Sequence, residues 1–299
     1  MSDFRKRLMD ARRAYKSKDY DRAYEIYSEL YGEIPFDNSA RYSYAWAIYQ
    51  SRVKNYTDSS QLLSDAELIT RLTRQNDLNR TQLCVYTMAV FKVMKMLYEN
   101  RDYENLTYWL SKINPDLLDE VRYSRDGEVF ASNRETYYVY SSVAFFKLGE
   151  YEKCIAVSKR ALNSLSKFTQ NSAVYFQWRI AKSLRRTGEY SEALKYLEEV
   201  RKNLQEWYVY HEIAENYYYL QDDEESLRYA LAAALMSPPR DMKFNLYSLL
   251  ADLLKNDWPE YSEKHEKLVE MIRNDETSGK RELKQELAEI WKELNNELN

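Results

Sequence analysis

Few residues in this chain have the types and the spacing that chemistry requires. The sequence holds two histidines, His211 and His265, and two cysteines, Cys84 and Cys154. It has no HExxH zinc motif, no CxxC pair, no GxSxG nucleophile elbow and no phosphate-binding GxxxxGKS/T loop. Paired carboxylates could still catalyse acid–base chemistry, but the Asp and Glu residues are scattered along polar helix faces, where their ordinary role is solvation. We therefore expect no enzymatic activity, no cofactor and no metal site.

The histidines and cysteines are interpreted one by one. Cys84 lies in the apolar helix-like segment TQLCVYTMAVF, and Cys154 lies in a second helix-like segment, so we expect both thiols to pack rather than react. Two cysteines far apart in the sequence make no disulfide framework, which favours a reducing compartment. His211 has aromatic neighbours and is a candidate binding contact. His265, in the charged segment SEKHEKL, is expected to face solvent.

Helices must position most of these side chains, because the chain is poor in turn residues. Among 299 residues there are only five Gly and five Pro. All-β and Rossmann-type folds need turn glycines and Gly-rich loops, so the composition excludes both. A hydrophobic share of 44% and an aromatic share of 15% suffice for a sizeable core and exclude wholesale disorder. Apolar residues recur at helical spacing in segments such as 189–204, which predicts an all-α fold.

The polar breaks between the expected helices share one pattern. Four of them place an acidic residue before a tyrosine, at Asp19-Tyr20, Asp102-Tyr103, Glu150-Tyr151 and Glu189-Tyr190. Three residues after each tyrosine stands Ala23, Leu106, Cys154 or Ala193. A fifth copy, near Gln221-Asp222, continues with Ser226 and Pro238. Recurrence of this kind is the signature of a helical repeat.

This pattern resembles the tetratricopeptide repeat (TPR), a helix-turn-helix unit of about 34 residues. The small residue in the first helix of a unit corresponds to Ala11, Ser142, Ala181 and Ala214, and the terminal proline corresponds to Pro35 and Pro238. Cys154 falls at the small-residue position of a second helix. The units are roughly 4–37, 38–75, 80–114, 135–168, 174–207, 207–240 and 241–274. The resemblance implies a right-handed superhelical solenoid of about seven TPR-like helical hairpins, each burying its apolar face against its neighbours.

Two segments depart from the repeat. Residues 115–134 have polar and glycine breaks, and we expect an insertion there within a TPR-like α-solenoid over 1–274. Residues 275–281 are expected to form a short linker, and 282–299 a C-terminal amphipathic helix. Terminal repeats need a polar outer surface, so this helix is interpreted as a cap. A partner helix or short coiled coil is the alternative, because its apolar spacing is seam-like.

The resemblance also implies a binding groove, because the first helix of each TPR unit lines the concave wall. The family's groove positions fall on Arg5, Arg12, Tyr15, Lys16, Phe91, Lys92, Lys95, Tyr98, Tyr175, Trp178, Arg179, Lys182, Arg185, Arg186, Tyr208, His211 and Tyr218. The groove is thus expected to be basic and rich in Tyr, although the net charge is −4. The Lys/Asn clamp that holds acidic chaperone tails is not expected, because Tyr42, Ala45 and Ile48 stand where it would continue.

Two functions fit a basic, aromatic groove. The leading hypothesis is a cytoplasmic, non-enzymatic TPR scaffold or adaptor that binds a peptide segment or a protein partner. The alternative is RNA or single-stranded DNA, whose bases stack on rings while Arg and Lys meet the phosphates. Standalone repeat proteins of this kind also occur as accessory components of bacterial signalling or antiphage systems. The N-terminus lacks the apolar core of a secretory signal, and no apolar run is long enough for a transmembrane helix, so we expect no membrane partner.

Overall fold

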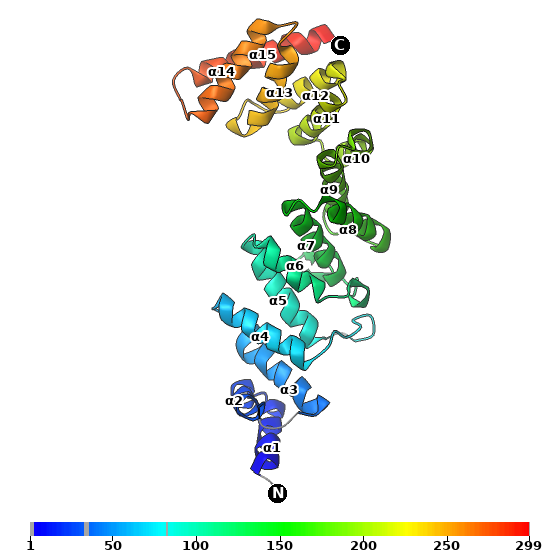
Figure 1. Ribbon diagram of the computed structural model, residues 1–299, viewed down its shortest axis with the longest axis vertical. Helices are drawn as coiled ribbons and strands as arrows, with labels where there is room; N and C mark the ends of the chain where they lie inside the picture. Colours follow the sequence, from blue (N-terminus) through cyan, green and yellow to red (C-terminus); the bar gives the residue numbers. More distant parts are fainter. Residues whose placement is uncertain (1–2, 33–35, 82, 299) are drawn as a thin grey trace. The chain divides into compact units, whose positions relative to one another are not determined.

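The computed structural model describes residues 3–32, 36–81 and 83–298. Helices make up nearly all of the regular structure, as coloured along the chain in Figure 1. The chain forms two compact units, one of Met1–Glu150 with Ser164–Thr169 and the other of Tyr151–Asn163 with Gln170–Asn299. The prediction of an all-α chain of TPR-like hairpins is confirmed, because the helices follow one another in the predicted order, two to a predicted repeat.

The first unit contains the helices up to α7. They are α1 (Asp3–Lys16), α2 (Tyr20–Leu30), α3 (Asn38–Ile48), α4 (Ser59–Leu72), α5 (Val85–Glu99), α6 (Tyr103–Ser111) and α7 (Asn133–Lys147). A π-helical turn, η1 (Tyr49–Val53), extends α3, and a 3₁₀ turn, η2 (Pro115–Leu117), follows α6. The pairs α1/α2, α3/α4 and α5/α6 pack together, and one apolar core runs through all of them.

The second unit continues the same construction. Its helices are α8 (Tyr151–Ser164), α9 (Ser172–Arg186), α10 (Tyr190–Asn203), α11 (Trp207–Tyr219), α12 (Asp223–Leu235), α13 (Phe244–Leu254), α14 (Pro259–Arg273) and α15 (Lys280–Leu298), with a 3₁₀ turn, η3 (Asp241–Lys243), before α13. The pairs α9/α10, α11/α12 and α13/α14 pack together. The last helix, α15, lies against α12 and α14 and buries Leu287, Ile290 and Trp291.

Small residues allow the paired helices to approach closely. Ala11, Ser142, Cys154, Ala181 and Ala214 are all fully buried. These are the positions at which the repeat pattern requires small side chains, and a larger one would separate the packed helices. Of the two terminal prolines, Pro238 follows the end of α12, where a proline cannot continue the helix, and Pro35 lies outside the described residues.

The turns inside the hairpins share one hydrogen-bond pattern. After α1, the backbone N–H of Lys18 donates to the carbonyl oxygen of Tyr15 at 3.0 Å, and that of Asp19 donates to Ala14 at 2.9 Å. Lys18 has a φ of 63°, the left-handed conformation that ends many helices. The side chain of Asp19 then accepts the N–H of Arg22 and caps α2. The acidic-Tyr signature in the sequence is therefore a helix stop joined to a helix start.

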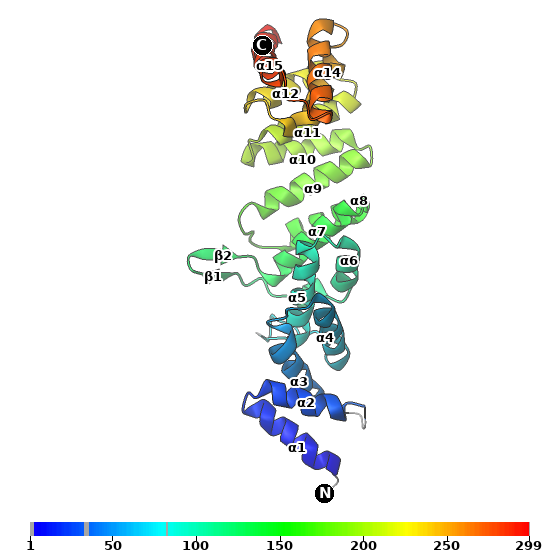
Figure 2. The same ribbon diagram turned by 90° about the vertical axis from the view of Figure 1, so that its left-hand side faces the viewer.

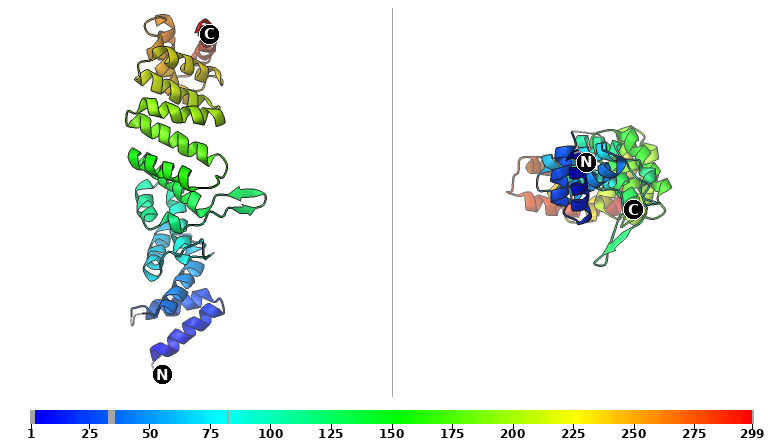
Figure 3. Two further views of the ribbon diagram at one scale, coloured as in Figure 1. Left: turned by 90° about the vertical axis from the view of Figure 1, so that its right-hand side faces the viewer. Right: turned by 90° about the horizontal axis from the view of Figure 1, so that it is seen from below.

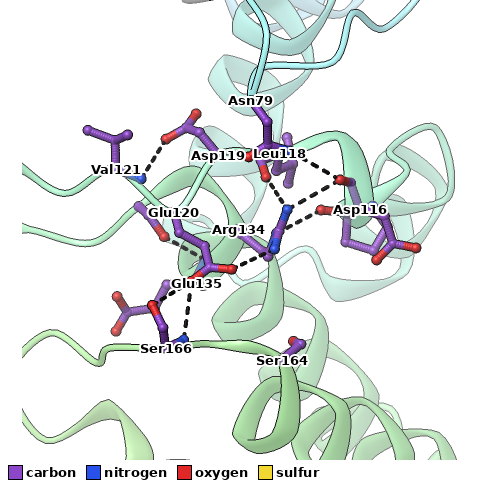
Figure 4. A network of polar contacts seen from close by, with 12 residues as sticks. Asn79, Asp116, Leu118, Asp119, Glu120, Val121, Arg134, Glu135, Ser164 and Ser166 are labelled. Carbon is purple, nitrogen blue, oxygen red and sulfur yellow. Dashed lines mark hydrogen bonds and ion pairs between the residues drawn. The ribbon is translucent and has the colours of Figure 1, made fainter.

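The segment 115–134 carries a short antiparallel hairpin, β1 (Tyr123–Arg125) and β2 (Glu128–Phe130). The hairpin projects from the helices in Figures 2 and 3, and Val129 and Phe130 are exposed. Arg134, which follows the hairpin, contacts the segment that precedes it. Its Nε donates to the carbonyl oxygen of Pro115 at 3.1 Å, and its Nη1 pairs with Glu120 at 2.6 Å. Figure 4 shows this network together with Ser166, which donates to Glu120.

Lys243 is a buried cation with every hydrogen of its ammonium group engaged. Its Nζ donates to the carbonyl oxygens of Ala233, Ala234 and Ser237, each at 3.0 Å. These carbonyls lie at the C-terminal end of α12, where a positive charge is favourable. Burial lowers the pKa of Lys243 to about 8. The residue joins the end of α12 to the start of α13.

Two sequence interpretations are wrong. His265 does not face solvent: it is fully buried, its Nδ1 lies 2.7 Å from the carbonyl oxygen of Tyr261, and its Nε2 accepts the indole N–H of Trp291 at 2.8 Å. Burial lowers its pKa to about 4. Cys84 does not lie inside a helix but precedes α5, where its sulfur accepts the N–H of Thr87. Both residues are buried, as an inert structural role requires.

Candidate functional site

The sequence-predicted groove residues fall in both units. Arg5 and Lys16 on α1 are exposed. Arg12 pairs with Asp37 at 2.8 Å, and the ring of Tyr15 meets the ring of Tyr20 edge-on at 5.9 Å between centroids. The side chains of Arg12 and Tyr15 thus contact other residues of the first unit.

The residues on α5 have a different set of neighbours. The Nζ of Lys92 lies 5.6 Å from the ring centroid of Tyr56, and the ring of Tyr98 stacks on Tyr140 of α7 at 4.5 Å. Lys95 is exposed and pairs with Glu99 on its own helix, and Phe91 packs against the core. Helix α1 packs on α2 and α3, whereas α5 packs on α4, α6 and α7. The α1 residues and the α5 residues thus have separate surroundings.

In the second unit, α9 and α11 bring several predicted residues together. We call this surface the α9–α11 face; it consists of Tyr175, Trp178, Lys182 and Arg185 of α9 and Tyr208, His211, Glu212 and Glu215 of α11. The ring of Trp178 stacks on Tyr208 at 5.1 Å, and Tyr175 lies 6.2 Å from Trp178. The Nζ of Lys182 lies 4.7 Å from the Trp178 ring, within reach of a cation–π interaction. The result is a continuous aromatic strip with Tyr175 exposed at its edge.

The cations of this face are neutralised by carboxylates. Arg185 pairs with Glu212 at 3.1 Å and also with Glu215, and only 11% of its side chain is exposed. Burial alone would lower the pKa of Arg185, but the two carboxylates outweigh it and leave the pKa raised. Lys182 also pairs with Glu212, at 3.5 Å. The positive charge expected here is therefore matched by negative charge from α11.

Two buried ring nitrogens on the face have no hydrogen-bond partner among the described residues. They are the indole Nε1 of Trp178 and the Nε2 of His211. Buried polar atoms are nearly always hydrogen-bonded, so such atoms need an explanation. Burial, reinforced by the charge of Arg185, lowers the pKa of His211 to about 4, although Glu212 opposes the shift. The imidazole is thus neutral at pH 7 and stacks against Trp207 at 6.3 Å.

The remaining predicted residues lie around this face. The guanidinium carbon of Arg179 is 5.0 Å from the ring centroid of Phe176 on the same helix. Arg186 and Tyr218 are exposed, near the ends of α9 and α11. The repeat pattern predicts the aromatic and basic residues of α9 and α11 on one surface, but it does not predict that Glu212 and Glu215 pair with Arg185. Their spacing of three residues on one helix face was the available signal.

Two further properties concern the described residues only. They contain no group of three or more His, Cys, Asp or Glu side chains placed to hold a metal ion. None of their helices is long and apolar enough to cross a membrane.

Several solved structures are similar to this chain at low identity. MamA (41-end) from Desulfovibrio magneticus RS-1 is 14% identical, with a TM-score of 0.48 over 64% of this chain and 97% of that chain. RapI in its apo form is 15% identical, with a TM-score of 0.48 over 93% of this chain and 78% of that chain. A tetratricopeptide repeat protein from Parabacteroides merdae is 12% identical, with a TM-score of 0.43 over 96% and 98% of the two chains.

No family model and no curated protein matches the chain. Because these three TM-scores are below 0.5, the fold assignment rests on the chain's own helices. Those helices pair in sequence order, small residues are fully buried where the repeat pattern expects them, and the turns repeat one hydrogen-bond pattern. The chain is an all-α protein built of TPR-like helical hairpins.

Proposed function

We propose that this chain is a non-enzymatic scaffold that binds an extended segment of a protein partner on the α9–α11 face. The observation that carries the proposal is the aromatic strip formed by Trp178, Tyr208 and the exposed Tyr175. An extended peptide presents backbone N–H and C=O groups along its whole length. Such groups can hydrogen-bond with the hydroxyl of Tyr175 at the edge of the strip while the rings supply apolar contact.

The aromatic strip supplies contact area for such a peptide. Trp178, Tyr208 and Tyr175 have few rotatable bonds, so their ordering on binding costs little conformational entropy. Stacking already fixes Trp178 and Tyr208 in the free protein. A partner side chain placed beside Tyr175 would extend the strip, and aromatic residues of this kind carry much of the binding energy at protein interfaces.

The paired charges favour a protein ligand over a nucleic acid. Arg185 already has two carboxylate partners, and Lys182 shares one of them. A phosphate at this place would have to approach Glu212 and Glu215, and like charges repel. A peptide with small, aromatic or mixed-charge side chains meets no such opposition. RNA or single-stranded DNA binding, and the cytoplasmic location expected from the sequence, stay predictions.

The domain organisation forms part of the proposal. We propose that α15 is a capping helix for the hairpins of the second unit, with segment 275–281 as its linker. The support is that α15 buries Leu287 and Trp291 against α12 and α14, which leaves its polar side outward. The fully buried hydrogen bond between Trp291 and His265 fixes the position of α15 on α14.

Site-specific photocrosslinking tests the binding proposal. A benzophenone amino acid replaces Tyr175, and in a matched control it replaces Tyr219, which is also exposed but stacks on Tyr190 of α10 at 4.9 Å. The full chain is irradiated in lysate of its source cells, with and without nuclease, and adducts are identified by mass spectrometry. We expect a nuclease-resistant polypeptide adduct at position 175 that is absent at 219 and is lost with Trp178→Ala.

Other outcomes contradict the proposal. Adducts of equal yield at both positions, or none at 175, would remove the α9–α11 face as the binding surface. An adduct at 175 that nuclease destroys would replace the protein partner with RNA or DNA.

A further inference from the structure

A cavity in the first unit is lined by residues that the predicted groove does not include. A cavity of about 590 Å³ lies where the start of α3, the end of α4 and the start of α5 come together. These helices are neighbours in Figure 1. Its volume falls in the range of about 300–1,000 Å³ that small-molecule sites occupy. We call it the arginine cavity, because Arg41, Arg71 and Arg74 line it.

The three arginines come from three different parts of the chain. Arg41 is on the first turn of α3, Arg71 is on the last turn of α4, and Arg74 is in the connection that follows α4. The described lining includes no Asp and no Glu. Three like charges around one cavity repel one another, and an anion between them would relieve that repulsion.

The positive charge of these arginines is poorly neutralised by acidic residues of the protein. The side chains of Arg41 and Arg74 have no acidic partner among the described residues. Arg71 approaches Glu67 only at 3.9 Å, and that carboxylate already pairs with Lys112 at 3.1 Å. The guanidinium groups of Arg41 and Arg74 are therefore available to a ligand, and that of Arg71 is only weakly paired.

In a second cavity lined by basic residues, a carboxylate of the protein pairs with the lysines. Lys280, Arg281 and Lys284 line a cavity of about 400 Å³ beside α15, and Asp241 pairs with both lysines. Basic residues around a cavity thus do not by themselves make an anion site. The arginine cavity differs because Arg41 and Arg74 have no such carboxylate among the described residues, and Arg71 shares Glu67 with Lys112.

We propose that the arginine cavity binds a phosphate-bearing ligand of about the size of a nucleotide. Guanidinium groups bind phosphate oxygens through two parallel N–H donors, and three of them suit a ligand with two linked phosphates. Asn38, Thr73 and Asn76 add neutral donors and acceptors to the lining. The exposed ring of Tyr42 at the cavity offers a surface on which a base can stack.

Calorimetric titration of the full chain tests the proposal with inorganic pyrophosphate, ADP and adenosine. We expect pyrophosphate and ADP to bind and adenosine not to bind. Arg41→Ala and Arg74→Ala should each weaken binding roughly tenfold or more, because each removes a hydrogen bond to a charged group. The control is Arg80→Ala: Arg80 lies on the same connection, pairs with Asp77 and does not line the cavity. That control should keep the affinity within about twofold.

The titration also distinguishes the source of the phosphate. If ADP binds more tightly than pyrophosphate and Tyr42→Ala removes the difference, the ligand is a nucleotide; equal affinities identify a free polyphosphate. Absence of binding by both probes at about 1 mM would overturn the proposal. Equal losses in the Arg80→Ala control and in the cavity variants would overturn it too. Melting curves of Arg41→Ala and Arg74→Ala, both exposed positions, show that the variants are folded.

Discussion

The α9–α11 face and the arginine cavity both gather basic side chains, yet their electrostatic states are opposite. On the face, Arg185 is almost buried and has two carboxylate partners from α11. In the cavity, Arg41 and Arg74 are exposed and have no acidic partner among the described residues. The number of arginines on a surface therefore does not measure its affinity for anions. The residues on the neighbouring helix determine whether that charge is used inside the fold or left for a ligand.

The largest expected effect comes from removing the carboxylates of the face. Glu212→Gln with Glu215→Gln should destabilise the second unit by about 3 kcal/mol, because Arg185 is left buried without a counter-charge. Urea unfolding at pH 7 measures the change in free energy. Restoring neutrality with Arg185→Met in the same background should recover part of the loss. A change below about 0.5 kcal/mol would mean that Arg185 is solvated and that the two regions do not differ.

The next largest effect is expected on the pH dependence of stability, to which His211 on the α9–α11 face contributes. The pKa of His211 is about 4 in the folded chain and 6.5 in its ordinary state, so the unfolded chain binds a proton more readily between these values. Stability contributed by neutral His211 is therefore complete above pH 6.5 and lost as the pH falls towards 4. His211→Gln should reduce the stability difference between pH 7.5 and 5 by about 2 kcal/mol.

His265 provides the matched case away from the face, because burial lowers its pKa to the same value of about 4. His265→Gln should reduce the pH dependence by a similar amount in the same unfolding experiment. An unchanged slope in either variant would show that the corresponding imidazole has nearly the same pKa in the folded and the unfolded chain.

Two turns of the second unit have a residue with positive φ at the same position, and only one of these residues is a glycine. Gln221 has a φ of 61° at the position that glycine occupies in the preceding turn, where Gly188 has a φ of 86°. Gln221→Gly should stabilise the second unit by about 0.5–1 kcal/mol, and Gly188→Ala should destabilise it by a similar amount. A Cβ at Gly188 would meet no atom within 4 Å, so backbone strain alone would account for the loss. Thermal unfolding of both variants checks the opposite signs.

The smallest effect is expected in the arginine cavity. Arg41→Ala with Arg74→Ala should change the stability of the unliganded chain by less than about 0.5 kcal/mol, since neither side chain has a charged partner to lose. Urea unfolding of the first unit measures it. A loss comparable to that of the carboxylate variant would show that these arginines hold the fold together, and the contrast with Arg185 would disappear.

Local features of the sequence predicted the fold well. The positions of Ala11 and Ala181, and the acidic residue at each turn, follow from rules that act within one hairpin. The pairing of Arg185 with Glu212 and of His265 with Trp291 could not be predicted in this way, because each joins residues at least 26 positions apart. The arginine cavity depends on three chain segments and was likewise outside the repeat pattern. Repeat rules therefore locate the surfaces but not their charge states.

The buried ammonium group of Lys243 has a consequence for chemical labelling. Its lowered pKa would make an accessible amine reactive towards acylating reagents at neutral pH, but the side chain is buried and its ammonium hydrogens are engaged by carbonyl oxygens at the end of α12 and just beyond it. Labelling of Lys243 must therefore wait until α12 and α13 separate. The rate of its acylation, followed by peptide mass spectrometry, therefore reports how often that junction opens. Exposed lysines such as Lys195 react without any opening of the fold, so their acylation rate is the reference for an unprotected amine.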